Sequence, residues 1–597
     1  MFSIYQLKAH MALVFVVKDR KYSEWSVLGA GGAEANLPID FNQHKLFHED
    51  RLTLKDEANP EAGFSVFSPT RQFQYMSGVL VLEDGKTYGR AGKKMLYRCC
   101  PDNKYLPYFL IPYTPKLGFD KSKSKINLFV TFKFNAWGPG TKHPLGTMLN
   151  VIGMVDDLPA FYEYQLYCKS LNASIQNFNR DVIRKTKEKT ETEFVDEILR
   201  TNPSIRNFSK DDTLEIYSID PPQSRDFDDA FSVEILDGLP ANETQHFRIR
   251  IYIANVSLWM SHLDLWKSFS NRISTIYLPD RRRPMLPTIL SDCLCSLQAG
   301  VNRFAFVYSM TFKNKVLIEK DYFNALIKVK KNYVYEEKSL KKAAWFKPAI
   351  QVVSRLNKFP GFHMISDVEN SNDLVAFLML IMNCDTAKAM LGFKNGIYRM
   401  ASVKEETLEI PEHLPNDTQK FLKVWNSFGG TYCLYNENTA EIAHQMMSLD
   451  SYLHITSPIR RLVDLLNMII LQDNLGLLLR REKAMEFVEG WIQQLDYINT
   501  TMRAIRKVQN QCALMDEITR RDKDPELKEA TLAGCMFHRI KRNDGMYHYI
   551  VYLHELKLVS QFKCEYEFDN YHEAAFQLYY YSKEDNMKKK VKLRLVD

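Results

Sequence analysis

The stretch Ile219-Asp220-Pro-Pro-Gln-Ser-Arg-Asp226-Phe-Asp228-Asp229-Ala230 is the densest chemical signal in the chain, with four carboxylates within ten residues. Because Pro221-Pro222 cannot continue a central strand, we expect Asp220 at the end of a strand and the other carboxylates on a loop. In an extended segment Asp226 and Asp228 point to one side, and Asp229 points to the other unless the chain bends. The stretch therefore predicts a loop that gathers carboxylates at a strand end.

Four gathered carboxylates repel one another unless cations neutralise them. Oxygen-only ligands suit Mg²⁺ or Mn²⁺, and two such ions can clamp the attacking and leaving oxygens of a phosphodiester. Three other interpretations stay open. An EF-hand would place Phe231 at its glycine position and Asp237 at its glutamate position. A nucleotide-sugar Asp-x-Asp site would use only two carboxylates. A solvated acidic turn would pair with Arg225.

A second signal is the run Thr456-Ser457-Pro458-Ile459-Arg460-Arg461, followed by Asp464. It predicts a turn and a helix start, with Pro458 at the first helical position. There Arg460, beside backbone amides that favour phosphate, could bind a phosphate bidentately and stabilise charge in a transition state. The alternative is an Arg460–Asp464 pair at i,i+4 that only supports the helix.

At these two motifs the sequence resembles the RNase II/RNB family of 3′→5′ exoribonucleases. The family run Asp-Pro-x-x-x-Arg-Asp-Phe-Asp-Asp-Ala matches residues 220–230, and its Thr-Ser-Pro-Ile-Arg-Arg matches residues 456–461. Further matching blocks follow in the family's order, at Tyr252–Ser257, Tyr277–Asp280, Met285–Pro287 and Ser291–Leu297. Some positions depart from the family's pattern. Tyr252 stands in place of a histidine, Asn255 in place of an aspartate, and Asn467-Met468 where the family often has Asn-His-Arg.

The resemblance implies a metal site and an RNA-binding site. The implied ligands of Mg²⁺, or of Mn²⁺, are Asp220, Asp226, Asp228 and Asp229. Loss of Asp228 should impair catalysis most with the least loss of RNA binding, and Arg460 should contact the scissile phosphate. The implied RNA-binding residues are Tyr277, which would stack on the 3′-terminal base, Phe393 as the candidate for a second stacking aromatic, Arg460 and Arg461.

The fold class predicted from pattern and resemblance is multidomain α+β, with a central mixed α/β RNB catalytic domain flanked by small OB-fold or cold-shock β-barrels. Short alternating stretches in the first 165 or so residues support small barrels, although a single irregular β domain is an alternative. The predicted domains are a first cold-shock-like barrel at 1–75, a second at 76–170, a linker at 171–206, the RNB domain with C-terminal helices at 207–525 and a C-terminal OB-fold RNA-binding domain at 526–597. The layout resembles the eukaryotic exosome-type branch without a PIN domain.

Several individual elements are also predicted. Alternation over Phe247–Ile253 indicates a strand, and Asp373–Met390 is apolar at helical spacing. The basic run Arg180–Thr192 indicates a linker or a solvated helix. An apolar stripe at helical spacing over Met485–Ile498 indicates one long helix. Asn416 or Asp417 is typical of a helix N-cap.

The composition is that of an ordinary globular protein. Of 597 residues, 45% are apolar and 25% are charged, which excludes wholesale disorder, collagen and coiled coil. A net charge of +7 permits an anionic partner. Ten cysteines without a Cys-x-x-Cys pair indicate reduced thiols, so we expect a cytoplasmic or a nuclear location. The apolar run at residues 11–17 is too short to span a membrane.

These features together predict a Mg²⁺-dependent hydrolytic 3′→5′ exoribonuclease that degrades single-stranded RNA to nucleoside 5′-monophosphates. We expect a monomer without a membrane partner, with an RNA-decay complex as a further partner to consider. Two rival functions stay open. One is a catalytically inactive RNA-binding protein on the RNB fold, and the other is an interaction scaffold that only docks partners.

Overall fold

The computed structural model describes the chain except for residues 1–12, 30–31, 36, 38, 57–62, 116–125, 238–245, 402–408, 427–429, 438–448, 583–588 and 597. It divides into two compact units. One unit comprises Met1–Asn172, Leu278–Asp280 and Lys507–Asp597, and the other comprises Ala173–Tyr277 and Arg281–Arg506. This division groups several of the predicted domains in one unit, so the predicted domain boundaries stay predictions.

The first unit begins with a four-stranded antiparallel sheet around a small apolar core that includes Phe15, Val17 and Leu52. Its strands, in sheet order, are β2 (Trp25–Leu28), β1 (Leu13–Val17), β3 (Arg51–Leu54) and β4 (Phe64–Phe67). Two short helices accompany it, α1 (Phe41–His44) and α2 (Pro69–Gln72). Strand β1 lies within the apolar run predicted at residues 11–17, of which 11 and 12 lie outside the described residues.

The second sheet of this unit closes into a barrel, because β5 pairs with both β9 and β7. Its strands, in sheet order, are β5 (Met76–Leu80), β9 (Leu128–Ala136), β10 (Leu145–Met154), β8 (Phe109–Tyr113), β7 (Lys94–Pro101) and β6 (Arg90–Ala91). Closure requires glycine at position 78, since a Cβ there would lie 2.8 Å from the Cys100 carbonyl oxygen. Two separate sheets thus replace the single irregular domain that the sequence left as an alternative.

The C-terminal sheet completes the first unit, together with α3 (Leu158–Cys168) and the short α14 (Pro525–Lys528). Its strands, in sheet order, are β24 (Leu558–Cys564), β23 (Tyr547–Leu553), β22 (Leu532–Lys541), β25 (His572–Ser582) and β26 (Lys589–Val596). The edge strands β24 and β26 lie next to each other. Helix α13 (Leu495–Lys523) begins in the second unit and ends in the first.

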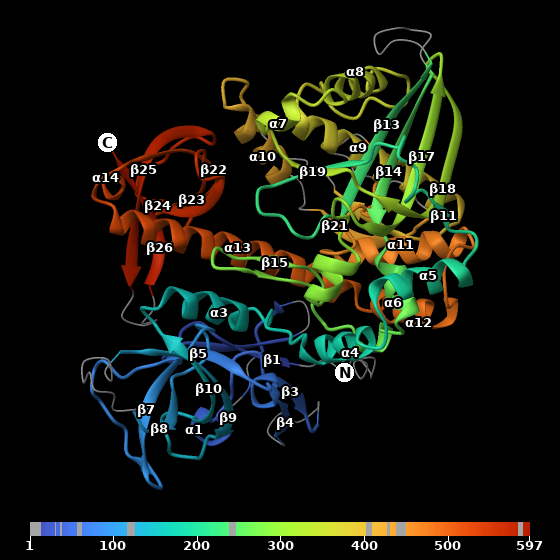
Figure 1. The fold of residues 1–597 in the computed structure, drawn as a ribbon. Helices are drawn as coiled ribbons and strands as arrows, with labels where there is room; N and C mark the ends of the chain where they lie inside the picture. Colours follow the sequence, from blue (N-terminus) through green and yellow to red (C-terminus); the bar gives the residue numbers. More distant parts are fainter. Residues whose placement is uncertain are drawn as a thin grey trace. The chain divides into compact units, whose positions relative to one another are not determined.

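The second unit is built on a seven-stranded mixed sheet, whose long strands β13, β14, β17 and β18 lie side by side in Figure 1. In sheet order the strands are β11 (Arg206–Asn207), β18 (Val316–Lys328), β17 (Asn302–Lys313), β14 (His246–Ala254), β13 (Asp229–Asp237), β12 (Tyr217–Asp220) and β19 (Lys331–Val334). Among the described strands of this sheet, only β11–β18 and β12–β19 pair in parallel. Two small hairpin-like sheets pair β15 (Ile276–Tyr277) with β16 (Arg282–Arg283) and β20 (Ile397–Met400) with β21 (Thr431–Leu434).

Helices pack around this sheet. They are α4 (Gln176–Thr186), α5 (Glu191–Thr201), α6 (Val256–His262), the 3₁₀ turn η4 (Trp266–Ser268), the π-helical turn η5 (Ile289–Leu294), α7 (Lys338–Lys341), α8 (Phe346–Leu356), α9 (Ser371–Gly392), α10 (Asn416–Asn426), α11 (Leu462–Asn474) and α12 (Arg481–Ile492). Helix α9 is long and apolar enough to cross a membrane by length and composition, but two thirds of its apolar window is buried inside the fold, as expected of a core helix. The predicted multidomain α+β fold class with small β-barrels is confirmed.

Three local predictions differ from the structure. The segment 171–206, predicted as a linker, folds into α4 and α5, whose apolar side chains such as Phe178 and Ile198 are buried. The single helix predicted over Met485–Ile498 is two helices, because the chain turns at Gln493-Gln494 and the Gln494 side chain donates to the Gly490 carbonyl at 3.0 Å. Helix α10 starts at Asn416 itself, so neither Asn416 nor Asp417 is an N-cap.

Candidate active site

The sheet register brings Asp220 and Asp229 to the ends of neighbouring strands. Asp220 is the last residue of β12, as predicted, and pairs with Val334 of β19. Asp229 is the first residue of β13, which pairs with β12 through Tyr217 and Phe231. The loop between them is therefore a short connection whose two ends are fixed by backbone hydrogen bonds.

The loop is held from inside by Ser296. Its hydroxyl accepts the Phe227 N–H at 3.0 Å and donates to the Arg225 carbonyl at 2.8 Å. The Leu297 N–H donates to the Phe227 carbonyl at 3.0 Å. These bonds lie in the matched block that ends at Leu297, so this block fixes the backbone on which the aspartates stand.

Asp228 is the most enclosed of the four aspartates, with 2% of its surface exposed. Its Oδ1 accepts the Ile459 N–H at 2.8 Å, and its Oδ2 accepts Nε of Arg460 at 3.0 Å. Both predicted motifs therefore meet at this one carboxylate. Burial raises the pKa of Asp228 to about 7, although the charge of Arg460 opposes that rise.

Asp226 faces a different pair of partners. Its carboxylate forms an ion pair with Arg282 and accepts the Tyr277 hydroxyl at 3.3 Å. Arg225 forms no ion pair within the part of the chain that the structure describes. The acidic loop is therefore not a solvated turn paired with Arg225, because its charges are enclosed and two of them are paired with arginines far along the chain.

Among the described residues, Asp220 and Asp229 form no ion pair, unlike the other two aspartates. Burial raises the pKa of each carboxyl. The charges of Asp228 and Asp226 raise the pKa of Asp220 further, and the charge of Asp220 does the same for Asp229. Asp220 Oδ2 is buried and has no hydrogen-bond partner among the described residues. A buried oxygen left without a donor is costly, and a cation would remove that cost.

The four predicted ligands are not gathered as one ready set. Within the described ranges, no three His, Cys, Asp or Glu side chains lie close enough together to hold a metal ion. Arg282 and Arg460 each hold one of the carboxylates instead. The donor chemistry nevertheless fits a hard divalent cation, because all donors are carboxylate oxygens and the orphaned Asp220 Oδ2 is one of them.

The two neighbouring arginines of the second motif point to different partners. Arg460 leaves 42% of its side chain exposed and also donates to the Ser457 hydroxyl at 2.9 Å. Arg461 pairs with Asp464 at 2.9 Å, which replaces the Arg460–Asp464 pair considered from the sequence. Arg460 thus contacts the acidic site and keeps part of its side chain exposed, whereas Arg461 forms an ion pair within the fold.

The helix of this motif begins later than predicted. It is α11, and its first residue is Leu462, so Pro458 lies in the preceding turn and not at the first helical position. The reason is that Asp464 accepts the Ser457 N–H at 2.8 Å, while Arg461 is extended and bridges to Ser274. Arg460 therefore sits on a turn and does not share a helical first turn with phosphate-binding amides.

The predicted stacking aromatics are placed differently. Tyr277 lies on β15, is exposed and reaches Asp226 through its hydroxyl. Phe393 follows α9 and is exposed. Its ring makes no contact with another predicted site residue in the described part of the chain. Tyr277 is thus a member of the acidic site by contact, and Phe393 is placed near it only by the resemblance.

Sequence reasoning did not single out three residues that the structure brings to this region. Arg282 pairs with Asp226. The three arginines Arg281–Arg283, which follow the Tyr-Leu-Pro-Asp block, were the sequence feature that could have indicated a cation near the acidic site. Tyr335 follows β19, and its N–H donates to the Asp220 carbonyl at 3.2 Å. Arg399 of β20 is only 8% exposed and lies over the Tyr432 ring at 4.9 Å. No sequence pattern marked Arg399 or Tyr335.

Arg399 is a buried cation with no carboxylate partner among the residues that the structure describes. Burial lowers its pKa, and the nearby charges of Arg461 and Arg506 lower it further. Within the described residues its guanidinium forms no ion pair. Isolated buried charges are costly unless paired, so Arg399 favours an anionic ligand.

Comparison with known proteins adds to this geometry. Residues 209–359 match the family model of the RNB domain. The chain carries an RNB domain. The match covers β12 to β19 and all four aspartates, while Arg460 lies beyond it.

The RNB domain has curated relatives of modest identity. The chain is 30% identical over 198 residues to ribonuclease R of Chlamydia pneumoniae, covering 32% of this chain and 27% of that protein. It is 24% identical over 431 residues to DIS3-like exonuclease 2 of Schizosaccharomyces pombe, covering 55% of this chain and 43% of that protein. The chain thus spans less than half the length of the curated relatives that it matches.

Solved structures share the fold over nearly the whole chain. RNase R of Mycoplasma genitalium, in complex with ribose-methylated single-stranded RNA, aligns with a TM-score of 0.69 and 15% identity, covering 98% of this chain and all of that one. Yeast Ssd1, described as a pseudonuclease, aligns with a TM-score of 0.56 and 13% identity, covering 95% of this chain and 80% of that one. At these identities the likeness shows the fold alone, and both an RNase and a pseudonuclease have that fold.

Proposed function

We propose that this protein is a divalent-metal-dependent, hydrolytic 3′→5′ exoribonuclease that acts on single-stranded RNA and releases nucleoside 5′-monophosphates. The observation that carries the proposal is the convergence on Asp228, where the acidic loop meets the Ile459 N–H and the half-open Arg460. The RNB domain and the fold shared with an RNA-bound RNase R support the same class. Single-stranded RNA is accordingly the proposed substrate.

The chain's own residues would divide the work as follows. Arg460 presents its open face to a phosphate and stabilises the charge that develops there. Tyr277 stacks on the terminal base, with its hydroxyl anchored on Asp226. Arg399 holds a further phosphate.

The implied Mg²⁺, or Mn²⁺, would be held by the four aspartates, namely Asp220, Asp226, Asp228 and Asp229. When bound, such a cation supplies a more acidic water and neutralises phosphate charge. Arg282 and Arg460, which pair with two of these carboxylates, would then be released toward the RNA.

The decisive experiment uses RNA labelled at its 5′ end, incubated with the protein in Mg²⁺ or in EDTA. We expect a ladder that shortens from the 3′ end to a short limit product and is absent in EDTA. Internal cuts in the first time points would contradict an exonuclease. RNA that stays intact with Mg²⁺ and with Mn²⁺, yet is retarded on a native gel, would contradict hydrolysis.

The second candidate is a catalytically inactive RNA-binding protein on the RNB fold. Two observations favour this second candidate. The chain has the fold of a pseudonuclease, and arginines pair with two of the four carboxylates. All four aspartates are nevertheless present in this chain, and loss of metal ligands is the simplest route to inactivity. The labelled-RNA experiment separates the two candidates directly.

Stabilisation by Mg²⁺ is expected to be larger at pH 8 than at pH 6. Because burial raises the pKa of Asp228 to about 7, a cation must displace a proton at pH 6 but not at pH 8. Each displaced proton weakens binding by about tenfold per pH unit below the pKa. The measurement is the shift of the melting temperature with Mg²⁺ against EDTA at both pH values.

The same pKa shift determines how the stability of the metal-free protein changes with pH. A carboxyl whose pKa is raised on folding binds protons more tightly in the native state, so the free energy of unfolding falls as pH rises from about 4 to about 7. In EDTA we therefore expect a lower melting temperature at pH 8 than at pH 6. Equal Mg²⁺-induced shifts at the two pH values would contradict a role for these carboxylates in cation binding.

Replacing Tyr277 with alanine is expected to weaken binding of single-stranded RNA by about 1–3 kcal/mol, which is roughly 5- to 150-fold in Kd. The exposed ring supplies the stacking surface, so Tyr277→Phe should bind RNA almost as the wild type does. The measurement is fluorescence anisotropy of labelled RNA in EDTA. Equal binding by the alanine and phenylalanine variants would show that the ring does not stack on RNA.

A further inference from the structure

Arg282 is shared between two carboxylates of the second unit. Its Nη2 donates a hydrogen bond to Oδ2 of Asp292, and its Nη1 forms an ion pair with Oδ1 of Asp226. A guanidinium carries five N–H donors in a fixed fork, so one arginine can serve two acceptors at once. Asp226 is a predicted metal ligand, whereas Asp292 is not.

The two contacts of Arg282 differ in quality. The contact with Asp292 has the geometry of a hydrogen bond. The Nη1 atom that faces Asp226 is buried and has no hydrogen-bond partner among the described residues, so its attraction to Asp226 is that of charge alone. Charge-assisted hydrogen bonds are the stronger kind of pair. Arg282 is therefore anchored on Asp292 and held more loosely by Asp226.

Asp292 is itself held in place. It lies in the π-helical turn η5, its Oδ1 accepts the Ser291 hydroxyl at 2.5 Å, and its carbonyl oxygen accepts Nε2 of Gln298 at 2.5 Å. π-Helical turns are rare and are frequently found at functional sites. The same segment continues to Ser296, which holds the acidic loop. One stretch of chain thus fixes both the loop of aspartates and the anchor of Arg282.

The cost of binding a cation at Asp226 depends on Asp292. A metal cation and a guanidinium repel each other, so Arg282 has to give up Asp226 when that carboxylate becomes a metal ligand. The side chain of Arg282 is largely enclosed, and an enclosed charge that loses its only partner is costly. With Asp292 in place, Arg282 gives up one of two partners and stays paired. Asp292 therefore lowers the cost of freeing Asp226.

We propose that Asp292 is a positioning residue for the proposed metal site, where it retains Arg282 when Asp226 turns from the arginine to a divalent cation. The inference rests on the proposed function, since that function requires the cation. It adds a carboxylate that touches no cation itself and acts through Arg282. Held on one side, Arg282 keeps its freed Nη1 next to the acidic site, where a phosphate oxygen can accept it.

The test is Mn²⁺ binding by the whole protein without RNA at pH 8, measured from the electron paramagnetic resonance signal of free Mn²⁺. We expect Asp292→Asn to raise the Kd by about 10-fold, because Arg282 then has Asp226 as its only charged partner. Arg282→Gln should lower the Kd, since the competing cation is gone. In the double variant Arg282→Gln/Asp292→Asn the Kd should equal that of Arg282→Gln, because Asp292 has no arginine left to hold.

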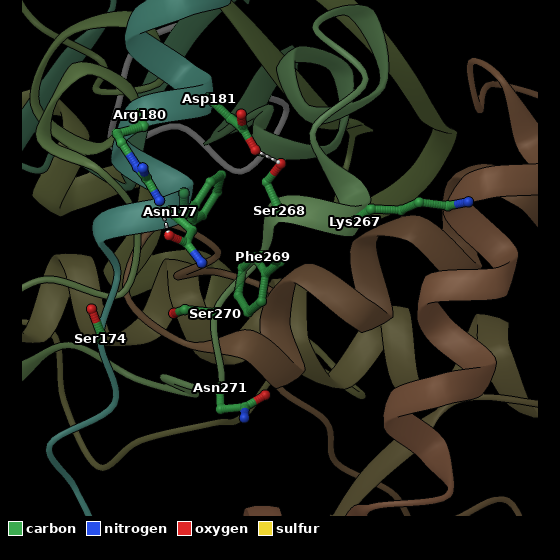
Figure 2. Close-up of a pocket in the computed structure, with 10 residues that line it drawn as sticks. Ser174, Asn177, Arg180, Asp181, Lys267, Ser268, Phe269, Ser270 and Asn271 are labelled. Atoms are coloured by element: carbon green, nitrogen blue, oxygen red, sulfur yellow. Dashed lines mark hydrogen bonds between the residues drawn. The ribbon is translucent and has the colours of Figure 1, made fainter. Parts of the chain in front are cut away.

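The matched control is Asp181→Asn. Asp181 also pairs with an arginine, Arg184 at 3.1 Å, and also accepts a serine hydroxyl, that of Ser268 at 2.6 Å. It lines the cavity of about 480 Å³ shown in Figure 2, whose described lining residues include none of the predicted metal ligands. The control makes the same chemical change in the same unit, so its Kd for Mn²⁺ should equal that of wild type.

An Asp292→Asn variant that binds Mn²⁺ as tightly as wild type would overturn the inference. So would a loss of affinity that persists in the Arg282→Gln background, because that loss would reflect long-range charge alone. If Asp292→Asn fails to fold, Arg282→Gln decides by itself, and a Kd at or above that of wild type contradicts the competition. In each of these cases wild type binds Mn²⁺ and the proposed function stands. A wild-type protein that binds no Mn²⁺ would overturn both.

Discussion

Replacement of Asp228 with asparagine is expected to lower the rate of RNA hydrolysis by on the order of 10²–10³-fold or more, with RNA binding nearly unchanged. Asparagine has the same shape, and its Oδ1 can still accept the Ile459 N–H that Asp228 accepts at 2.8 Å. Its neutral amide cannot balance the charge of Arg460 or offer an anionic oxygen to a cation. The variant therefore removes charge at the point where the two motifs meet and keeps the backbone arrangement.

The measurement is single-turnover hydrolysis in Mg²⁺ together with anisotropy of the same RNA in EDTA. Asp196→Asn serves as the matched control, since it makes the same chemical change at an exposed position of α5. Its rate should equal that of wild type. Two outcomes would contradict a role of Asp228 in the reaction. In one, the Asp228→Asn variant is fully active, and in the other it loses hydrolysis and RNA binding to the same degree.

Replacement of Arg460 with glutamine is expected to reduce hydrolysis by about 10²–10³-fold while the fold stays stable. Its side chain is partly open to solvent, and its partner Asp228 can take up a proton near neutral pH once the arginine is gone. The adjacent Arg461→Gln should behave differently. It leaves Asp464, which is fully buried, without its ion-pair partner, and such a loss costs about 3–5 kcal/mol of stability.

The two arginine variants are therefore separated by unfolding in denaturant and by activity below the melting temperature. Arg460→Gln should unfold close to wild type and be almost inactive. Arg461→Gln should unfold at clearly lower denaturant and keep a larger share of its activity at low temperature. The reverse pattern would mean that Arg460 supports the fold and Arg461 meets the RNA.

Much of the local structure of the site could be predicted from the sequence. The proline pair after Asp220 ends β12 where expected, and alternation placed the strand β14 that pairs with Asp229. The apolar spacing of α9 was equally clear. These signals are local, since each depends on residues within one strand, turn or helix.

Partners distant in the chain could not be predicted in this way. The bond between Arg460 and Asp228 joins positions 232 residues apart, and no period or cap records such a contact. The start of α11 was predicted too early for a related reason. Pro458 is a favourable first helical residue, but Asp464, six residues further on, accepts the Ser457 N–H and holds Pro458 in a turn before the helix. The turn at Gln493-Gln494 that separates α12 from α13 also could not be predicted from the sequence, since glutamine is a good helix former.

The separation between Asp228 and Arg460 has a consequence during translation. Ribosomes add about 5–20 residues per second, so roughly 10–50 seconds pass between synthesis of the aspartate and synthesis of the arginine 232 positions later. During that interval the emerging polypeptide carries all four carboxylates, hydrated and unassembled. A nascent chain of the proposed nuclease thus lacks the arginine of its acidic site until translation has passed position 460.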